Sequence, residues 1–267
     1  MRGLSADLRH AAVFLRRPAG ERGAGGMKTL FMLGHAGGNA VQYASLFAGM
    51  GKTMKLVPLE LPGHGRRLGE PLLDNIADMV RDLRRQALDA LAESTDYALF
   101  GHSMGGILAH ALAVDLEGHA PIPAHVVISS TCTPGRHHIP SGFPELSDQD
   151  LWRESAAYFG GMPDQIATSA ELMALFAPIL RADLKAVLDW DCPRLPAVDA
   201  PITALCGDAD IVDMEDAEIW RRYTTRDFAA HVLPGGHFHV LERPENLEEL
   251  LAMILNGLRI LNFSTVR

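Results

Sequence analysis

The sequence predicts an α/β protein: a mostly parallel central sheet flanked by helices, with a helical segment inserted near its middle. From Met27 onward, strand-length apolar runs alternate with helical runs, which is typical of a sheet covered on both faces. The alternation breaks between residues 134 and 193, where two helical runs follow one another without a strand. We therefore expect a core formed by residues 27–133 and 194–267, interrupted by a helical cap (lid) of residues 134–193.

Each predicted element rests on its own run of residues. The apolar run TLFML at 29–33 and the run at 54–59 are strand-like, whereas residues 75–94 carry apolar side chains every third or fourth position, as one face of a helix does. The other expected strands are 97–100, 125–129, 202–206 and 229–233, and the other expected helices are 104–116, 148–158, 171–190, 215–223 and about 244–258.

Composition excludes several classes of protein. A chain of 267 residues with 48% hydrophobic and 21% charged residues can bury a sizeable core. The net charge of −9, without a basic block, predicts that nucleic acid is not a partner. No apolar run reaches the about 18 residues of a membrane-spanning helix, so we expect no membrane association. Three widely spaced cysteines predict neither a disulfide framework nor a zinc site and favour the cytoplasm.

The first 26 residues differ from the rest of the chain. They are rich in Arg and Gly, and their apolar run at 11–15 is too short for a secretory signal. We expect residues 1–26 to be a leader or flexible extension outside the fold, with a short amphipathic helix as the alternative.

The strongest local motif is Gly101-His102-Ser103-Met104-Gly105, a G-x-S-x-G between a predicted strand and a predicted helix. A nucleophile placed on such a tight turn needs glycine neighbours, because a Cβ there would collide with the backbone. We therefore interpret Ser103 as a catalytic nucleophile.

A serine hydroxyl needs an imidazole to take its proton and a carboxylate to orient that imidazole. Both follow predicted strands downstream, in the loops Cys206–Asp210 and Pro234–His239. The Gly-x-x-Asp form of the first loop favours Asp210 as the acid, which leaves Asp208 to accept backbone N–H groups. In the second loop, His237 directly follows the Gly pair and is the predicted base, with His239 behind it or at the surface.

The Gly-rich loop at 34–39 (GHAGGN) follows the first predicted strand of the core. Small residues there let backbone N–H groups approach an oxyanion, so we predict an oxyanion hole formed by the backbones of Ala36 and Met104. We expect His35 to fix this loop by hydrogen bonding rather than to act as a base.

At this point the chain resembles the type II thioesterases, stand-alone editing hydrolases of polyketide and nonribosomal peptide synthases with an alpha/beta-hydrolase fold. The motifs in common are HAGGNAVQY at 35–43, LPGHGRRLGEP at 61–71, FGHSMGG at 100–106, YFGGMP at 158–163, PILRADL at 178–184, ALCGDAD at 204–210 and GGHFHVLE at 235–242. The chain departs from the family where Leu-Pro-Gly-His-Gly replaces Tyr-Pro-Gly-Arg-Gly, and where Ser-Ser-Thr-Cys at 129–132 replaces a frequent Ser-Gly-Arg.

The resemblance implies a substrate, namely an acyl group held as a thioester on the phosphopantetheine arm of an acyl or peptidyl carrier protein, with acyl-CoA as a possible surrogate. It implies hydrolysis without a cofactor or metal, and the adjacent His137 and His138 lack the spacing of a metal motif. Because carrier proteins are typically acidic, we expect a local basic rim of Arg66, Arg67 and Arg136, or else solvated loop charges.

The cap is expected to shield an acyl pocket, although ordinary packing of the cap helices would also use such residues. We expect Arg181 and Asp183 to stabilise the cap. The alternatives on the same fold are a carboxylesterase or other small-ester hydrolase, an acyltransferase that uses the same acyl-enzyme, and a binding module that has lost turnover. The apolar candidates for the pocket are Phe159, Met162, Met173, Leu175, Phe176, Ile179 and Leu180.

Overall fold

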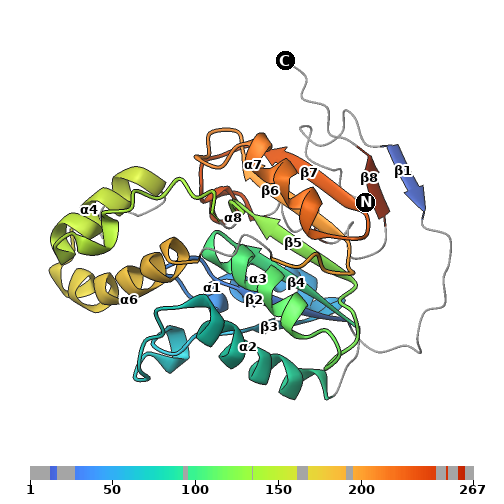
Figure 1. Cartoon of the computed structure of the whole chain (residues 1–267), viewed down its shortest axis with the longest axis horizontal. Helices are drawn as coiled ribbons and strands as arrows, with labels where there is room; N and C mark the ends of the chain where they lie inside the picture. The colour runs from blue at the N-terminus through green and yellow to red at the C-terminus, as the bar shows by residue number, and fades with distance from the viewer. Residues whose placement is uncertain are drawn as a thin grey trace.

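The computed structural model describes residues 13–16, 28–92, 96–133, 135–160, 168–190, 195–244, 251 and 258–261. A six-stranded sheet forms the centre, with every described pair of neighbouring strands parallel, and the predicted α/β fold class is confirmed (Figure 1). Its order is β3-β2-β4-β5-β6-β7, formed by β2 (Lys28–Leu33), β3 (Met54–Pro58), β4 (Tyr97–His102), β5 (His125–Ser129), β6 (Ile202–Gly207) and β7 (Phe228–Leu233).

Helices bury both faces of this sheet, because successive strand residues point to opposite sides. Phe31 and Leu33 lie in the cluster that contains side chains of α2, α3 and α7, whereas Leu30 and Met32 lie in the cluster that contains side chains of α1 and α8. The strands are therefore apolar without alternation, as expected for a parallel sheet. The helices are α1 (Ala40–Leu46), α2 (Ile76–Leu91), α3 (Met104–Asp115), α7 (Met214–Ile219) and α8 (His239–Glu242), with short 3-10 turns at Ala48–Lys52, Gly65–Arg67 and Trp220–Tyr223.

Besides the four-residue α8, helix α1 is the helix of the described core that the sequence analysis missed. It has only seven residues, too few for a clear helical periodicity. Its start is nevertheless marked by Asn39, whose side chain accepts a hydrogen bond from the Gln42 N–H at 3.0 Å. Asn75 begins α2 in the same way, through the N–H of Asp78.

The residues of the predicted cap form helices that project beyond the edge of the sheet (Figure 1). They comprise the 3-10 turn η4 (Phe143–Glu145), α4 (Asp148–Phe159) and α6 (Ala170–Leu188). Arg181 of α6 donates to the carbonyl of Pro144 and, at 2.7 Å, to the carboxylate of Asp148, so it joins these pieces as expected. The small apolar core between them contains Phe143, Leu151, Trp152, Leu180 and Leu184.

The two ends of the chain contain a second, separate pair of strands. β1 (Val13–Arg16) pairs antiparallel with β8 (Leu258–Leu261). The first 26 residues thus supply a strand, where we had expected an extension outside the fold or a short helix. The predicted helix at about 244–258 lies mostly outside the described residues. Among the described helices, none combines the length and apolar character needed to cross a membrane.

The topology places five chain segments at one edge of the sheet. The chain passes from β2 outward to β3 and then returns to β4 on the other side of β2. The loops after β2 and β4 therefore leave the sheet in opposite directions, and such a point is where open α/β sheets form their binding crevice. The carboxyl ends of β5, β6 and β7 lie along the same edge.

Candidate active site

Ser103 occupies a strained turn between β4 and α3. Its φ of 55° is positive, a conformation that non-glycine residues adopt rarely and that concentrates at functional sites. The turn is held by the Ser103 N–H, which donates to the Ser129 carbonyl at 2.8 Å, and by the Thr131 hydroxyl, which donates to the Ser103 carbonyl at 2.9 Å.

The two glycines of the motif are required by close backbone contacts. A Cβ on Gly101 would lie 1.9 Å from the carbonyl oxygen of Gly105, and a Cβ on Gly105 would lie 2.4 Å from the carbonyl oxygen of Leu33. Strand β2, strand β4 and the start of α3 thus pack backbone to backbone. This contact is the physical reason for the G-x-S-x-G pattern.

We expect Gly101→Ala to lower the free energy of unfolding by about 3 kcal/mol or more, because backbone rather than a mobile side chain blocks the new methyl group. Urea unfolding followed by circular dichroism measures this change. Gly69→Ala is the matched control, since Gly69 is exposed and its Cβ would meet nothing within 4 Å. Equal stability of the two variants would contradict the expectation.

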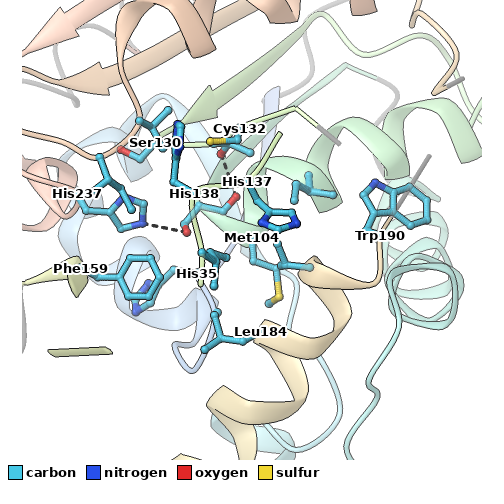
Figure 2. A pocket seen from close by; sticks show the side chains of 18 of the residues that line it. His35, Met104, Ser130, Cys132, His137, His138, Phe159, Leu184, Trp190 and His237 are labelled. Atoms are coloured by element: carbon cyan, nitrogen blue, oxygen red, sulfur yellow. Dashed lines mark hydrogen bonds between the residues drawn. The ribbon is translucent and has the colours of Figure 1, made fainter. Parts of the chain in front are cut away.

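The structure brings Ser103, His237 and Asp210 into one hydrogen-bonded chain. Figure 2 shows the His237 ring among the side chains that line the neighbouring cavity. His237 Nε2 lies 3.0 Å from Ser103 Oγ, and His237 Nδ1 lies 2.8 Å from Asp210 Oδ1. Because a carboxylate only accepts hydrogen bonds, Nδ1 carries the proton of the neutral ring and Nε2 is free to accept from the serine. This is the tautomer that a general base needs.

The two aspartates of the β6 loop have different surroundings. The Asp210 side chain is fully buried, whereas Asp208 is exposed and accepts the Gly235 N–H at 2.8 Å. Burial alone would raise the pKa of Asp210, but the hydrogen bond and charge of His237 hold it below the ordinary value. Asp210 is therefore a carboxylate wherever His237 is active, and Asp208 shapes the loop that carries His237.

Three further histidines surround His237, and sequence reasoning did not foresee them as a group. Burial lowers the pKa of His239 to about 4 and that of His35 to about 3, and it also holds the pKa of His102 well below the ordinary value. His35 lies 2.7 Å from the Tyr43 hydroxyl, a contact that fixes its loop. His102 and His239 both contact the hydroxyl of Ser129, at 3.1 and 3.2 Å. They are neutral polar packing around His237, the imidazole that contacts Ser103.

The predicted oxyanion donors lie beside Ser103. Ala36 and Met104 both line the cavity that Ser103 also lines. Met104 is the first residue of α3, and the N–H groups of a first helical turn have no acceptor within the helix and lie at its positive end. Both positions therefore suit the backbone donors that we predicted.

The cavity beside Ser103 is mostly apolar in its walls. Of the predicted pocket residues, Phe159 and Leu180 line it, whereas Met173, Leu175, Phe176 and Ile179 do not, and Met162 lies outside the described residues. Helical spacing could have identified the α6 side chains that face the cavity. The apolar residues at the start of α3 could have been found in the same way. The apolar wall contains Ile107, Leu180, Leu184, Val187 and Trp190.

One group near the cavity has the composition of a metal site. Ligand atoms of Cys132, His138 and Asp216 lie within 4.8 Å of one another. Both Asp216 oxygens are already engaged, one by Arg136 at 2.6 Å and the other by His138 at 2.6 Å. The guanidinium supplies the positive charge here, and burial raises the pKa of the Cys132 thiol to about 12. The group is therefore best described as a network of polar contacts that links Arg136 and His138, near the start of the predicted cap, to α7.

The three arginines of the predicted basic rim are all paired with carboxylates. Arg67 contacts Glu70 and Asp82, with only 19% of its side chain exposed. Arg136 contacts Glu215 and Asp216, and the Nε of Arg66 donates to Glu60 at 2.9 Å. Arg66, with 70% of its side chain exposed, is the one of the three that remains most accessible to a partner.

Comparisons with known proteins agree with this geometry. The thioesterase domain family model matches residues 28–257. The human medium-chain S-acyl fatty acid synthase thioesterase is 31% identical over 235 residues, covering 85% of this chain and 86% of the relative. Thioesterase TesA of Mycobacterium marinum is 31% identical over 232 residues, covering 86% of this chain and 90% of the relative.

Solved structures give the same result. The RedJ thioesterase from the prodiginine pathway of Streptomyces coelicolor superposes with a TM-score of 0.76 at 34% identity, covering 90% of this chain and 91% of that one. The type II thioesterase BorB from the borrelidin biosynthetic cluster superposes with a TM-score of 0.77 at 29% identity, covering 91% of this chain and 97% of that one.

Proposed function

The chain belongs to the thioesterase family, and within that family we propose that it removes acyl groups from the phosphopantetheine arm of carrier proteins in polyketide or nonribosomal peptide synthesis. The observation that carries this proposal is the strained Ser103, hydrogen-bonded to a buried His237 beside an apolar cavity. The pathways named for RedJ and BorB support the class of substrate.

We assign the roles in hydrolysis to three side chains and two backbone groups. Ser103 Oγ attacks the thioester carbonyl while His237 Nε2 takes its proton, and the backbones of Ala36 and Met104 stabilise the resulting oxyanion. The carbon–sulfur bond then breaks, and the thiol leaves with the proton from His237. Asp210 holds the tautomer of His237 and stabilises its cation.

The second half of the reaction repeats the same proton transfers. His237 takes a proton from a water molecule, which attacks the acyl-serine ester, and the acid is released as Ser103 regains its proton. No step in this sequence requires a metal or a cofactor. The acyl chain occupies the apolar wall between α3 and α6, so we propose that the cap, residues 134–193, covers the chain and limits the access of bulk water.

The state of the cysteines fits a cytoplasmic enzyme. Cys132 and Cys206 are free thiols, as expected in a reducing compartment, while Cys192 lies outside the described residues. We retain carrier protein as the partner, with acyl-CoA as a surrogate substrate. The arginines at 66, 67 and 136 are paired with carboxylates, which reduces the positive charge that a broad basic rim could offer to an acidic carrier protein.

We expect the protein to hydrolyse acyl thioesters at least about tenfold faster, in kcat/KM, than oxygen esters with the same acyl chain. The measurement is a panel of short to long acyl groups on CoA, on a loaded carrier protein and as simple esters, with the Ser103→Ala rate subtracted. A preference for oxygen esters would instead indicate a carboxylesterase. Transfer of the acyl group to an added alcohol or amine would indicate an acyltransferase, and a stable complex without product a binding module.

A further inference from the structure

A fully buried carboxylate links the cap to the loop that carries the Ala36 oxyanion donor. Asp183 of α6 has none of its side chain exposed, and its Oδ2 accepts the Gly37 N–H at 2.7 Å. Gly37 directly follows Ala36, and a Cβ placed on Gly37 would contact Leu180 of the same helix at 3.2 Å. We had expected Asp183 to stabilise the cap, and its hydrogen bonds join the cap helix α6 to the core.

The same Asp183 oxygen is contacted by a buried histidine. His64 Nε2 lies 2.9 Å from Asp183 Oδ2, and His64 Nδ1 lies 3.0 Å from the carbonyl oxygen of Pro62. A carbonyl and a carboxylate both only accept hydrogen bonds, so each ring nitrogen must carry a proton for both contacts to form. With Asp183 ionised, the geometry therefore requires the imidazolium form of His64.

The other charged groups around His64 agree with a cation at this position. Glu60, with 2% of its side chain exposed, lies close by and is itself paired with Arg66. His35, from the loop of Ala36, is neutral and does not compete. Burial alone would lower the pKa of His64, but the hydrogen bond and charge of Asp183, followed by Pro62 and Glu60, raise it above the ordinary value.

We propose that His64 and Asp183 are positioning residues, and that hydrolysis requires the protonated form of His64 to hold α6 and the Ala36–Gly37 segment in place. A neutral imidazole has one N–H to share between Pro62 and Asp183. The buried Asp183 oxygen would then face a ring lone pair, and its hold on Gly37 would loosen. This inference rests on the proposed thioesterase function, since it concerns the same oxyanion loop.

The test is the pH dependence of kcat for an acyl-CoA, with the Ser103→Ala rate subtracted. We expect kcat of the wild-type protein to fall about tenfold or more as pH rises through the pKa of His64, because a displaced oxyanion donor costs at least that much. His64→Arg keeps its charge at all working pH values, so this alkaline decline should disappear. His119→Arg, a substitution at an exposed histidine, should keep the wild-type profile.

Two further measurements decide the outcome even if His64→Arg does not fold. Asp183→Asn should move the alkaline decline to lower pH, whereas a role in packing alone would lower kcat equally at every pH. The ring nitrogens of His64, observed by NMR in the wild-type protein and assigned with His64→Gln, should both be protonated at neutral pH.

The inference is overturned if the wild-type protein hydrolyses thioesters but neither folded variant changes the alkaline decline, or if His64 is neutral at neutral pH. Failure of the wild-type protein to hydrolyse any thioester at any pH overturns the proposed function instead. The NMR titration still reports the charge of His64 in that case, so the two failures are distinguishable.

Discussion

Replacing Ser103 with alanine is expected to reduce kcat for acyl thioesters by about 10⁴- to 10⁶-fold. In the proposed mechanism this side chain supplies the atom that attacks, and no other hydroxyl contacts the Nε2 of His237 within the described residues. The measurement is single-turnover and steady-state hydrolysis of an acyl-CoA by the purified variant. The residual rate comes from the oxyanion donors and from binding alone.

Ser103→Ala also separates loss of chemistry from loss of fold. Alanine lacks the hydroxyl, but the N–H and carbonyl contacts of residue 103 belong to the backbone. The turn between β4 and α3 therefore stays anchored to Ser129 and Thr131. We expect the thermal midpoint to stay close to that of the wild-type protein, because the substitution leaves these backbone contacts and the positive φ unchanged. Substantial turnover by a folded Ser103→Ala variant would show that the nucleophile lies elsewhere.

The sheet and the long helices could be predicted because each carries enough residues to show its period. Every strand of the six-stranded sheet was predicted to within two residues at each end, since apolar runs buried on both faces are unambiguous in a chain that also alternates with helices. The seven residues of α1 fall below that limit. The pairing of β1 with β8 joins the two ends of the chain, and no local pattern encodes such a contact.

The candidate site could be predicted from the sequence where its residues follow the ends of strands in a fixed order. Ser103, the β6 loop and the β7 loop are placed in this way. The sequence could not show which residues approach from another element. The contact of Asp183 with Gly37 spans 146 positions, and its contact with His64 spans 119.

The histidines illustrate the same limit on a smaller scale. The chain has twelve, and their side chains are identical in the sequence. Burial lowers the pKa of His35, His102 and His239, while the hydrogen bond and charge of Asp183 raise the pKa of His64. These differences arise from desolvation and from partners distant in sequence, so only the folded structure assigns them.

The two aspartates of the β6 loop offer a matched pair of substitutions that tests the assignment of the acid. We expect Asp210→Asn to lower kcat by about 10⁴-fold. The amide NH₂ can donate to His237 Nδ1, which then accepts, so the ring proton moves to Nε2. In that tautomer Nε2 points a proton at Ser103 Oγ and cannot take one from it.

Asp208→Asn is expected to change kcat by less than about threefold, although it lies two positions away and makes the same chemical change. Its carboxylate is exposed, and the Gly235 N–H that it accepts at 2.8 Å can be accepted equally well by the amide oxygen of asparagine. Steady-state kinetics of both variants, with unfolding curves to show that each is folded, give the comparison. A large loss in Asp208→Asn beside an active Asp210→Asn would exchange the two roles. The expected result would show that burial against His237, rather than position on the loop, selects the acid.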